Sequence, residues 1–154
     1  MDSKYFIETL NLLAHPEGGY YKETYRSSGT VSTATGNRNY STAIYFLLEE
    51  GNFSALHKIK SDELWHFYKG DALEIIEITK TGNLKITELS EKNFQYCVPS
   101  GNWFGSRVEK GGKFSLVGCT VAPGFDFADF EMAKKDLLLK EFPQHSEIIT
   151  ELTR

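Results

Sequence analysis

The sequence predicts an all-β domain, a sandwich or barrel of short strands, with a helix before it and short helices after it. Between residues 20 and 121, short apolar or alternating segments are separated by turn residues such as Gly51-Asn52 and Gly82-Asn83. Aromatic residues, which favour strands, make up 14% of the chain, with 11 Phe and 8 Tyr. The length of 154 residues suits a single domain spanning residues 1–154.

The first expected element is a helix over residues 3–14. Phe6, Leu10 and Leu13 fall on one face at i, i+4 and i+7, and Asp2 or Ser3 can cap the start. The helix ends at the segment HPEGG, residues 15–19, because Pro and paired Gly interrupt regular structure. His15 and Glu17 in this segment either form a simple turn or lie at the mouth of a pocket.

The strands are expected in order over residues 20–27, 42–49, 53–59, 64–69, 73–79, 84–89, 94–98 and 113–121. The apolar run 43–48 is typical of a strand buried on both faces. In the segment 53–59, the period of two places Phe53, Ala55, His57 and Ile59 on one inner face. After residue 130 the period changes, and two short helices are predicted over residues 131–141 and 144–152, interrupted by Pro143.

Charge and composition disfavour several classes of partner. The net charge is −4 and the lysines are scattered, so nucleic acid binding is not expected. No apolar run approaches the roughly 18 residues of a membrane helix, and the N-terminus lacks the pattern of a signal peptide. The 2 cysteines, Cys97 and Cys119, provide no disulfide framework and read as small apolar residues. We therefore expect a cytoplasmic protein.

The most informative spacing is G-x5-H-x-I-x3-E-x6-G, formed by Gly51, His57, Ile59, Glu63 and Gly70. It resembles the first motif of the cupin superfamily, in which a second histidine stands at the position of Ile59. The segment from Pro99 to Phe104 resembles part of the second cupin motif, with Phe104 at the position of its histidine. Of the four usual cupin metal ligands, His57 and Glu63 remain and the other two positions are apolar.

Four further blocks resemble one branch of the superfamily, Cupin_5, long described as a domain of unknown function. They are HPEGGYY at residues 15–21, STAIYFLL at 41–48, SDELWHFY at 61–68 and LVGCTVAPGF at 116–125. The resemblance covers nearly the whole chain. It implies a double-stranded β-helix, the cupin jelly-roll barrel, commonly a homodimer, with a pocket similar to that of sugar-nucleotide epimerases and no established reaction. Sheet edges that a partner can cover also favour the homodimer.

His57 and Glu63 are the predicted catalytic residues, on strands that face each other across the barrel. The alternatives are a structural core histidine and a carboxylate turned outward. The expected ligand-binding residues are Trp65, His66, Phe67, Tyr45, Glu23 and Trp103. The alternation of side chains along a strand places Trp65 and Phe67 on the same face as Glu63. His66 lies on the opposite face, so it reaches the pocket only through a bulge and otherwise has a structural or interface role. Trp65 and Trp103 alternatively belong to the core, and only parity supports Glu23.

Three functions fit these residues. The first is an epimerase- or isomerase-like enzyme on a small polar or carbohydrate-like metabolite, with His57 as general base tuned by Glu63. The second is a non-catalytic protein that holds a small-molecule ligand in the barrel. The third is a metal-dependent cupin, which requires His66 or His15 as an additional ligand. We expect no cofactor, because a metal would have only His57 and Glu63 on the motif.

Overall fold

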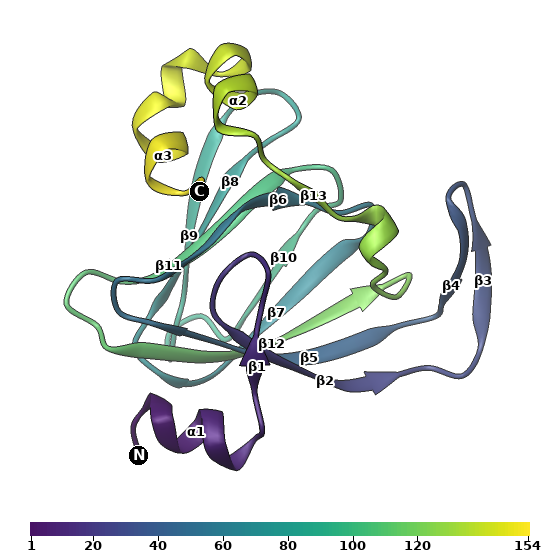
Figure 1. Cartoon of the computed structure of the whole chain (residues 1–154), viewed down its shortest axis with the longest axis vertical. Coiled ribbons are helices and arrows are strands. Elements are labelled where there is room, and N and C mark those ends of the chain that lie inside the picture. Colours follow the sequence, from purple (N-terminus) through teal and green to yellow (C-terminus); the bar gives the residue numbers. More distant parts are fainter.

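The computed structural model describes residues 1–154 as two facing antiparallel sheets with helices at both ends of the chain (Figure 1). This confirms the predicted all-β class. The first sheet has six strands, in the spatial order β1 (Leu13–Ala14), β2 (Tyr20–Arg26), β5 (Thr42–Glu49), β12 (Phe114–Ala122), β7 (Asp62–Gly70) and β10 (Gln95–Val98). The second has five, in the order β13 (Glu131–Met132), β6 (Phe53–Lys58), β11 (Trp103–Val108), β8 (Leu73–Ile78) and β9 (Leu84–Leu89).

The N-terminal helix α1 is shorter than predicted and spans Ser3–Thr9. The carboxylate of Asp2 caps it by accepting a hydrogen bond from the backbone N–H of Tyr5 at 2.9 Å. Asn11 adopts a left-handed conformation with φ 54°, which ends the helical path, and the chain then forms β1. Periodicity alone extended the helix too far because the following apolar residue, Leu12, packs against Leu47 and Leu116 beneath the sheet.

The C-terminal helices α2 (Lys135–Glu141) and α3 (Ser146–Glu151) cover the outer face of the five-stranded sheet (Figure 1). Two short 3-10 turns, η1 (Phe127–Asp129) and η2 (Pro143–His145), precede α2 and α3. The start of the predicted helix 131–141 instead forms β13, because Glu131 and Met132 pair with Lys58 and His57 at the sheet edge. No helix in the structure combines the length and the apolar character needed to cross a bilayer.

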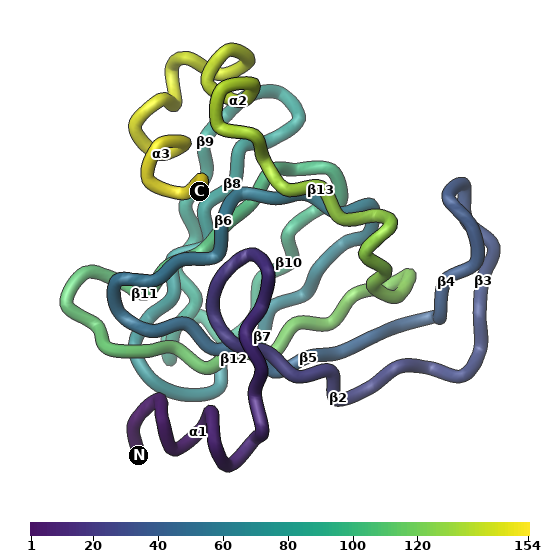
Figure 2. Tube along the Cα trace, viewed as in Figure 1, coloured from purple at the N-terminus to yellow at the C-terminus, as the bar shows by residue number.

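Besides β1 and β13, three more strands were not predicted from the sequence. The central strand β11 contains Gly105 and Ser106, which break the apolar pattern although they are buried between β6 and β8. The other two, β3 (Thr30–Thr33) and β4 (Gly36–Asn39), form a polar hairpin that projects from the barrel (Figure 2). Short, polar strands of this kind have the composition of a loop.

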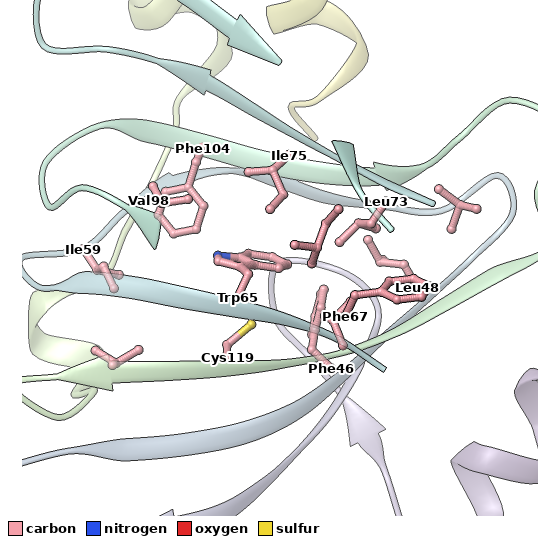
Figure 3. Close-up of a cluster of buried hydrophobic side chains, with 14 residues drawn as sticks. Phe46, Leu48, Ile59, Trp65, Phe67, Leu73, Ile75, Val98, Phe104 and Cys119 are labelled. Carbon is pink, nitrogen blue, oxygen red and sulfur yellow. The ribbon is translucent and has the colours of Figure 1, made fainter. Parts of the chain in front are cut away.

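The main core is a cluster of 14 buried residues between the two sheets (Figure 3). Trp65 lies at its centre, with its ring edge-on to Phe46 at 6.0 Å and to Phe104 at 6.4 Å. A second cluster fills the space between the five-stranded sheet and the C-terminal helices. These two layers fix the barrel wall that carries the residues described below.

A bulge in β6 changes which side chains face the interior. Phe104 pairs with His57 but Ser106 pairs with Ser54, so β6 contains one residue more than β11 in this interval. At Gly105, a Cβ atom would lie 2.6 Å from the carbonyl oxygen of Ser54, so only glycine fits. The extra residue turns Phe53 to the helix-covered side, against the second cluster, which corrects its expected place beside His57.

Candidate functional site

A cavity of about 420 Å³ opens between the two sheets at one end of the barrel. This volume lies in the range of small-molecule sites. Its lining combines titratable side chains with apolar side chains, most of which are aromatic. The lining residues are His15, Glu17, Tyr21, Glu23, Arg26, Thr42, Ile44, Phe46, His57, Ile59, Glu63, Trp65, Cys119, Val121, Phe125, Asp126, Phe127 and Phe130.

His57 uses both ring nitrogens in hydrogen bonds. Its Nε2 lies 2.9 Å from Oε2 of Glu17, and its Nδ1 lies 2.7 Å from the carbonyl oxygen of Ala55. Two oxygen acceptors require two N–H donors, which only the protonated imidazolium provides. The ring is packed between Phe104, at 4.1 Å between centroids, and Phe130, at 5.2 Å. His57 is therefore a buried cation with fixed orientation.

The loop between β1 and β2 brings Glu17 to His57. It crosses from the six-stranded sheet toward β6, where the backbone N–H of Ala55 donates to the carbonyl oxygen of Glu17 at 2.8 Å (Figure 2). Arg154 donates to the same oxygen at 2.7 Å. Gly18, with φ 109°, allows the close approach, because a Cβ there would lie 2.1 Å from the carbonyl oxygen of Phe53. The available sequence signal was a His and a Glu within a loop rich in Pro and Gly.

The Glu17–His57 contact is a buried ion pair. Burial alone raises the pKa of the Glu17 carboxyl, but the charge and hydrogen bond of His57 and the charge of His15 lower it below its usual value. Burial likewise lowers the pKa of His57, but the charge and hydrogen bond of Glu17, with a contribution from Glu63, raise it above its usual value. Each partner therefore favours the charged form of the other.

Glu63, near the start of β7, faces the same cavity and is buried. Burial raises its pKa to about 7; the charge of His57 lowers it, the charge of Glu17 raises it, and the nearby Cys119 thiol lowers it. The Cys119 thiol is buried, which raises its own pKa well above the usual value, so it stays neutral. Glu63 thus exchanges a proton in the neutral range, beside the ionised Glu17 and the protonated His57.

His15 supports the pair from the other side. Its Nδ1 accepts the backbone N–H of Glu17 at 3.2 Å and lies 3.8 Å from Oε1 of the same residue. Burial lowers the pKa of His15, which the charge of Glu17 partly opposes and the charge of His57 reinforces. A neutral ring with Nδ1 as acceptor fits both observations. The ring contacts Tyr21 edge-on, at 4.6 Å between centroids.

The mouth of the cavity carries a second ion pair and an aromatic rim. Arg26 and Glu23, both on β2, are 2.6 Å apart from Nη2 to Oε1. The rim is the segment 125–130, whose three phenylalanines contact one another. This segment is fastened to the β3–β4 hairpin, because Arg38 lies 2.8 Å from Asp129, from Nε to Oδ2.

Of the eight residues expected at the site, the cavity brings together His57, Glu63, Trp65 and Glu23. The partner expected for His57 was Glu63, whereas its hydrogen bond is made to Glu17. The indole N–H of Trp65 is buried and has no acceptor in the protein.

The other four expected residues lie outside the cavity. His66 and Tyr45 are on the outer face of the six-stranded sheet, where His66 Nε2 is 3.0 Å from Oγ1 of Thr120 and Tyr45 packs against Tyr68. Phe67 has the expected parity but lies in the closed part of the core. Trp103 points to the helix-covered face, with Nζ of Lys58 4.5 Å from its ring centroid. The alternation of side chains along a strand predicts which face of the sheet a residue lies on, but not how far along the barrel axis it lies.

The residues present do not fit the metal that cupin motifs commonly hold. Ile59 and Phe104 replace two ligands, and both are buried apolar side chains. Both nitrogens of His57 are engaged by Glu17 and Ala55. His66, a proposed replacement ligand, lies on the outer face and is hydrogen bonded to Thr120. No group of three or more His, Cys, Asp or Glu side chains is arranged to hold a metal ion.

Comparison with known proteins gives one consistent family. A family model described as Cupin_5, Cupin superfamily (DUF985), matches residues 4–133. The chain is 31% identical to the uncharacterized protein YML079W of Saccharomyces cerevisiae, over 87% of this chain and 76% of that protein.

Two solved structures are similar over almost their whole length. One is a hypothetical protein from Leishmania major, with a TM-score of 0.95, 34% identity and coverage of 99% of both chains. The other is protein SO0799 from Shewanella oneidensis, with a TM-score of 0.92, 38% identity and coverage of 100% of this chain and 98% of that one. Oxalate decarboxylase from Bacillus subtilis has a TM-score of 0.59 at 18% identity, over 90% of this chain and 36% of that one. This last similarity is one of fold and confirms the predicted cupin jelly roll.

Proposed function

Since the chain belongs to the Cupin_5 (DUF985) family of the cupin superfamily, we propose that it binds a small polar metabolite between its sheets and catalyses proton transfer on it, as an epimerase or isomerase does. The observation that supports this proposal most directly is the carboxyl group of Glu63. It is buried in the cavity beside the Glu17–His57 ion pair, and its pKa is raised to about 7. Groups whose environments push their pKa values apart are typical of acid–base sites.

In this proposal Glu63, rather than His57, transfers the proton. Both nitrogens of His57 already donate to Glu17 and Ala55, so the ring has no lone pair with which to act as a base. A group with a pKa near the working pH is both a sufficient base and a sufficient acid. His57 and Glu17 act as positioning residues, because their opposite charges adjust the proton affinity of Glu63, which its burial raises.

The proposed step is proton abstraction from a carbon next to a carbonyl group. The Glu63 carboxylate takes the proton, the C–H electron pair moves into the C–C–O system, and an enolate or enol forms. The protonated Glu63 then returns the proton to the neighbouring carbon while the hydroxyl proton of the substrate moves to the former carbonyl oxygen, which gives the isomer with no net change in atoms. Return of the proton to the same carbon gives the epimer when the intermediate has turned its opposite face to Glu63. Apolar walls formed by Trp65, Phe46 and Ile59 exclude water from the intermediate.

The test is hydrogen exchange on carbon with a panel of aldoses, ketoses and small hydroxycarbonyl compounds in D₂O, followed by NMR. We expect solvent deuterium to enter the α position of at least one compound, and Glu63→Gln to abolish this. His66→Ala is the matched control, because His66 lies on the outer face of the sheet. A compound that binds in the cavity without exchange would contradict catalysis and favour a binding protein.

We further propose that this chemistry needs no metal ion, since the two replaced ligand positions are filled by Ile59 and Phe104 and His57 is already engaged. Elemental analysis of untagged protein should give far less than one transition metal per chain, and exchange activity should survive treatment with a chelator. Stoichiometric zinc, iron or manganese whose binding is lost in His57→Ala would contradict this.

A further inference from the structure

Every cation that lines the cavity already has a carboxylate partner in the protein. Arg26 donates through Nε and Nη2 to the two carboxylate oxygens of Glu23, at 3.2 and 2.6 Å. Its remaining contacts are Nη1 to Oδ1 of Asn39 at 2.8 Å and Nη2 to the carbonyl oxygen of Phe125 at 3.1 Å. The His57 imidazolium is bound on both sides by Glu17 and Ala55. His57 therefore offers no free donor to a negatively charged ligand, and Arg26 keeps only one of its five N–H groups, the second on Nη1, without an acceptor in the protein.

The carboxylates are in the opposite situation. Glu63 faces the cavity and has no cation of its own, because the His57 charge is neutralised by Glu17. Asp126 lies at the mouth, 3.9 Å from a guanidinium nitrogen of Arg38, and that guanidinium is bound in bidentate fashion by Asp129 at 2.8 and 3.0 Å. The cavity therefore contains two pairs of opposite charges and two further acidic groups.

This balance determines which ligands are bound with a net gain. An anion placed here would lose its hydration and find only one free N–H of Arg26, whose charge Glu23 already neutralises, and it would be repelled by Glu63 and Asp126. A hydroxyl or ammonium group would instead donate to these carboxylates, and charge-assisted bonds of this kind are the stronger ones. The aromatic walls add favourable contact with the apolar side of a ring or with a cation.

We infer that the cavity selects uncharged or positively charged ligands that carry hydroxyl or amino donors, and excludes carboxylates and phosphate esters. The substrate class that follows is a free sugar, polyol or amino compound, rather than a sugar nucleotide or an organic acid. This inference rests on the proposed function only in taking the cavity as the ligand site.

The experiment uses three probes of one shape and different charge: benzylamine, benzyl alcohol and benzoate. Their binding to the whole protein is measured by ligand-observed NMR at about pH 8, where Glu63 is ionised. We expect the amine to bind at least about tenfold more tightly than benzoate, with the alcohol between them. Equal binding of all three, tighter binding of benzoate, or no binding of any probe at millimolar concentration would overturn the inference.

Two variants show that these carboxylates cause the preference. Glu63→Gln should reduce the ratio of amine to benzoate affinity, and Glu23→Gln should strengthen benzoate binding because it frees Arg26. Glu91→Gln removes the same charge at an exposed position outside the cavity and should leave the ratio unchanged. If Glu91→Gln shifts the ratio as much as Glu63→Gln, the preference reflects only the net charge of the protein and the inference fails.

The outcomes for ligand charge and for catalysis are separate. A preference for cations without hydrogen exchange on any compound contradicts the proposed reaction and leaves the charge selectivity intact. Exchange on an acidic or phosphorylated compound that depends on Glu63 supports the reaction and overturns the selectivity.

Discussion

The imidazole Nε2 of His57 and the carboxylate Oε2 of Glu17 lie 2.9 Å apart in the interior of the barrel, and both side chains are more than nine-tenths buried. His57 belongs to a strand of the five-stranded sheet, whereas Glu17 belongs to a loop between two strands of the other sheet. Their contact joins the loop to β6 and fixes the charge state of the site beside Glu63. The predictions below follow from this contact and from the residues around it.

Glu17→Gln should destabilise the protein by about 3–5 kcal/mol, because it breaks the buried ion pair and the His57 ring must give up its proton in the folded state. Urea denaturation measures the change in the free energy of unfolding. The control is Glu8→Gln, since the Lys4–Glu8 pair is 3.8 Å apart with both side chains mostly exposed, and its loss should cost less than about 1 kcal/mol.

A double-mutant cycle separates the pair from its members. His57→Gln combined with Glu17→Gln should be less destabilising than the sum of the two single changes, because no buried charge is then left unpaired. Strict additivity of the three values would show that the two side chains do not interact.

Glu63→Gln should become more stabilising as the pH rises. The pKa of Glu63 is raised in the folded state from 4.5 to about 7, so folding favours its protonated form. In the wild type, the contribution of this group to the free energy of unfolding is complete below about pH 4.5 and is lost as the pH rises through about 7. The loss amounts to about 3 kcal/mol at most. Glutamine mimics the protonated form, so the difference in the free energy of unfolding between variant and wild type should grow over this interval. A constant difference from pH 5 to pH 8 would contradict the raised pKa.

The His57 ring should remain an imidazolium above the pH at which an ordinary histidine loses its proton. The charge and hydrogen bond of Glu17 raise its pKa from 6.5 despite burial, so its stabilising contribution is complete below pH 6.5 and is lost as the pH rises from there through the higher folded value. Nitrogen-15 NMR of labelled histidines should show two protonated ring nitrogens for His57 at neutral pH. In Glu17→Gln the same ring should be neutral. An acceptor-type nitrogen in wild-type His57 at neutral pH would restore its role as a base.

Substitutions on the outer faces should not change ligand binding. His66→Ala and Trp103→Phe alter residues on the outer faces of the two sheets, and each should change the affinity of a cavity ligand less than about twofold. Phe130→Ala removes a ring that stacks on His57 and lines the cavity, and it should weaken the same ligand at least about tenfold. Titration followed by NMR or calorimetry measures all three. A large effect of Trp103→Phe alone would place the ligand outside this cavity.

Much of the fold was predictable from local patterns. The run 43–48, the alternating segments of β7 and β8 and the Gly82-Asn83 turn each indicated their structure, because hydrophobic period and turn chemistry are properties of neighbouring residues. β11 was not predictable in this way. Its Gly105 and Ser106 are buried only because β6 and β8 lie on either side of it.

The sequence by itself determined the family, the barrel class and the presence of His57 and Glu63 in one interior, since a single turn joins the two consecutive strands that carry them, one in each facing sheet. Only the tertiary structure decided what these residues do. It brought Glu17 to His57 through a loop that crosses between the sheets, which commits both nitrogens of the ring and leaves Glu63 as the group that titrates near neutrality. The physical reason is that pKa values depend on burial and on charges a few ångströms away in space, and the nearest of these charges comes from a segment outside the motif.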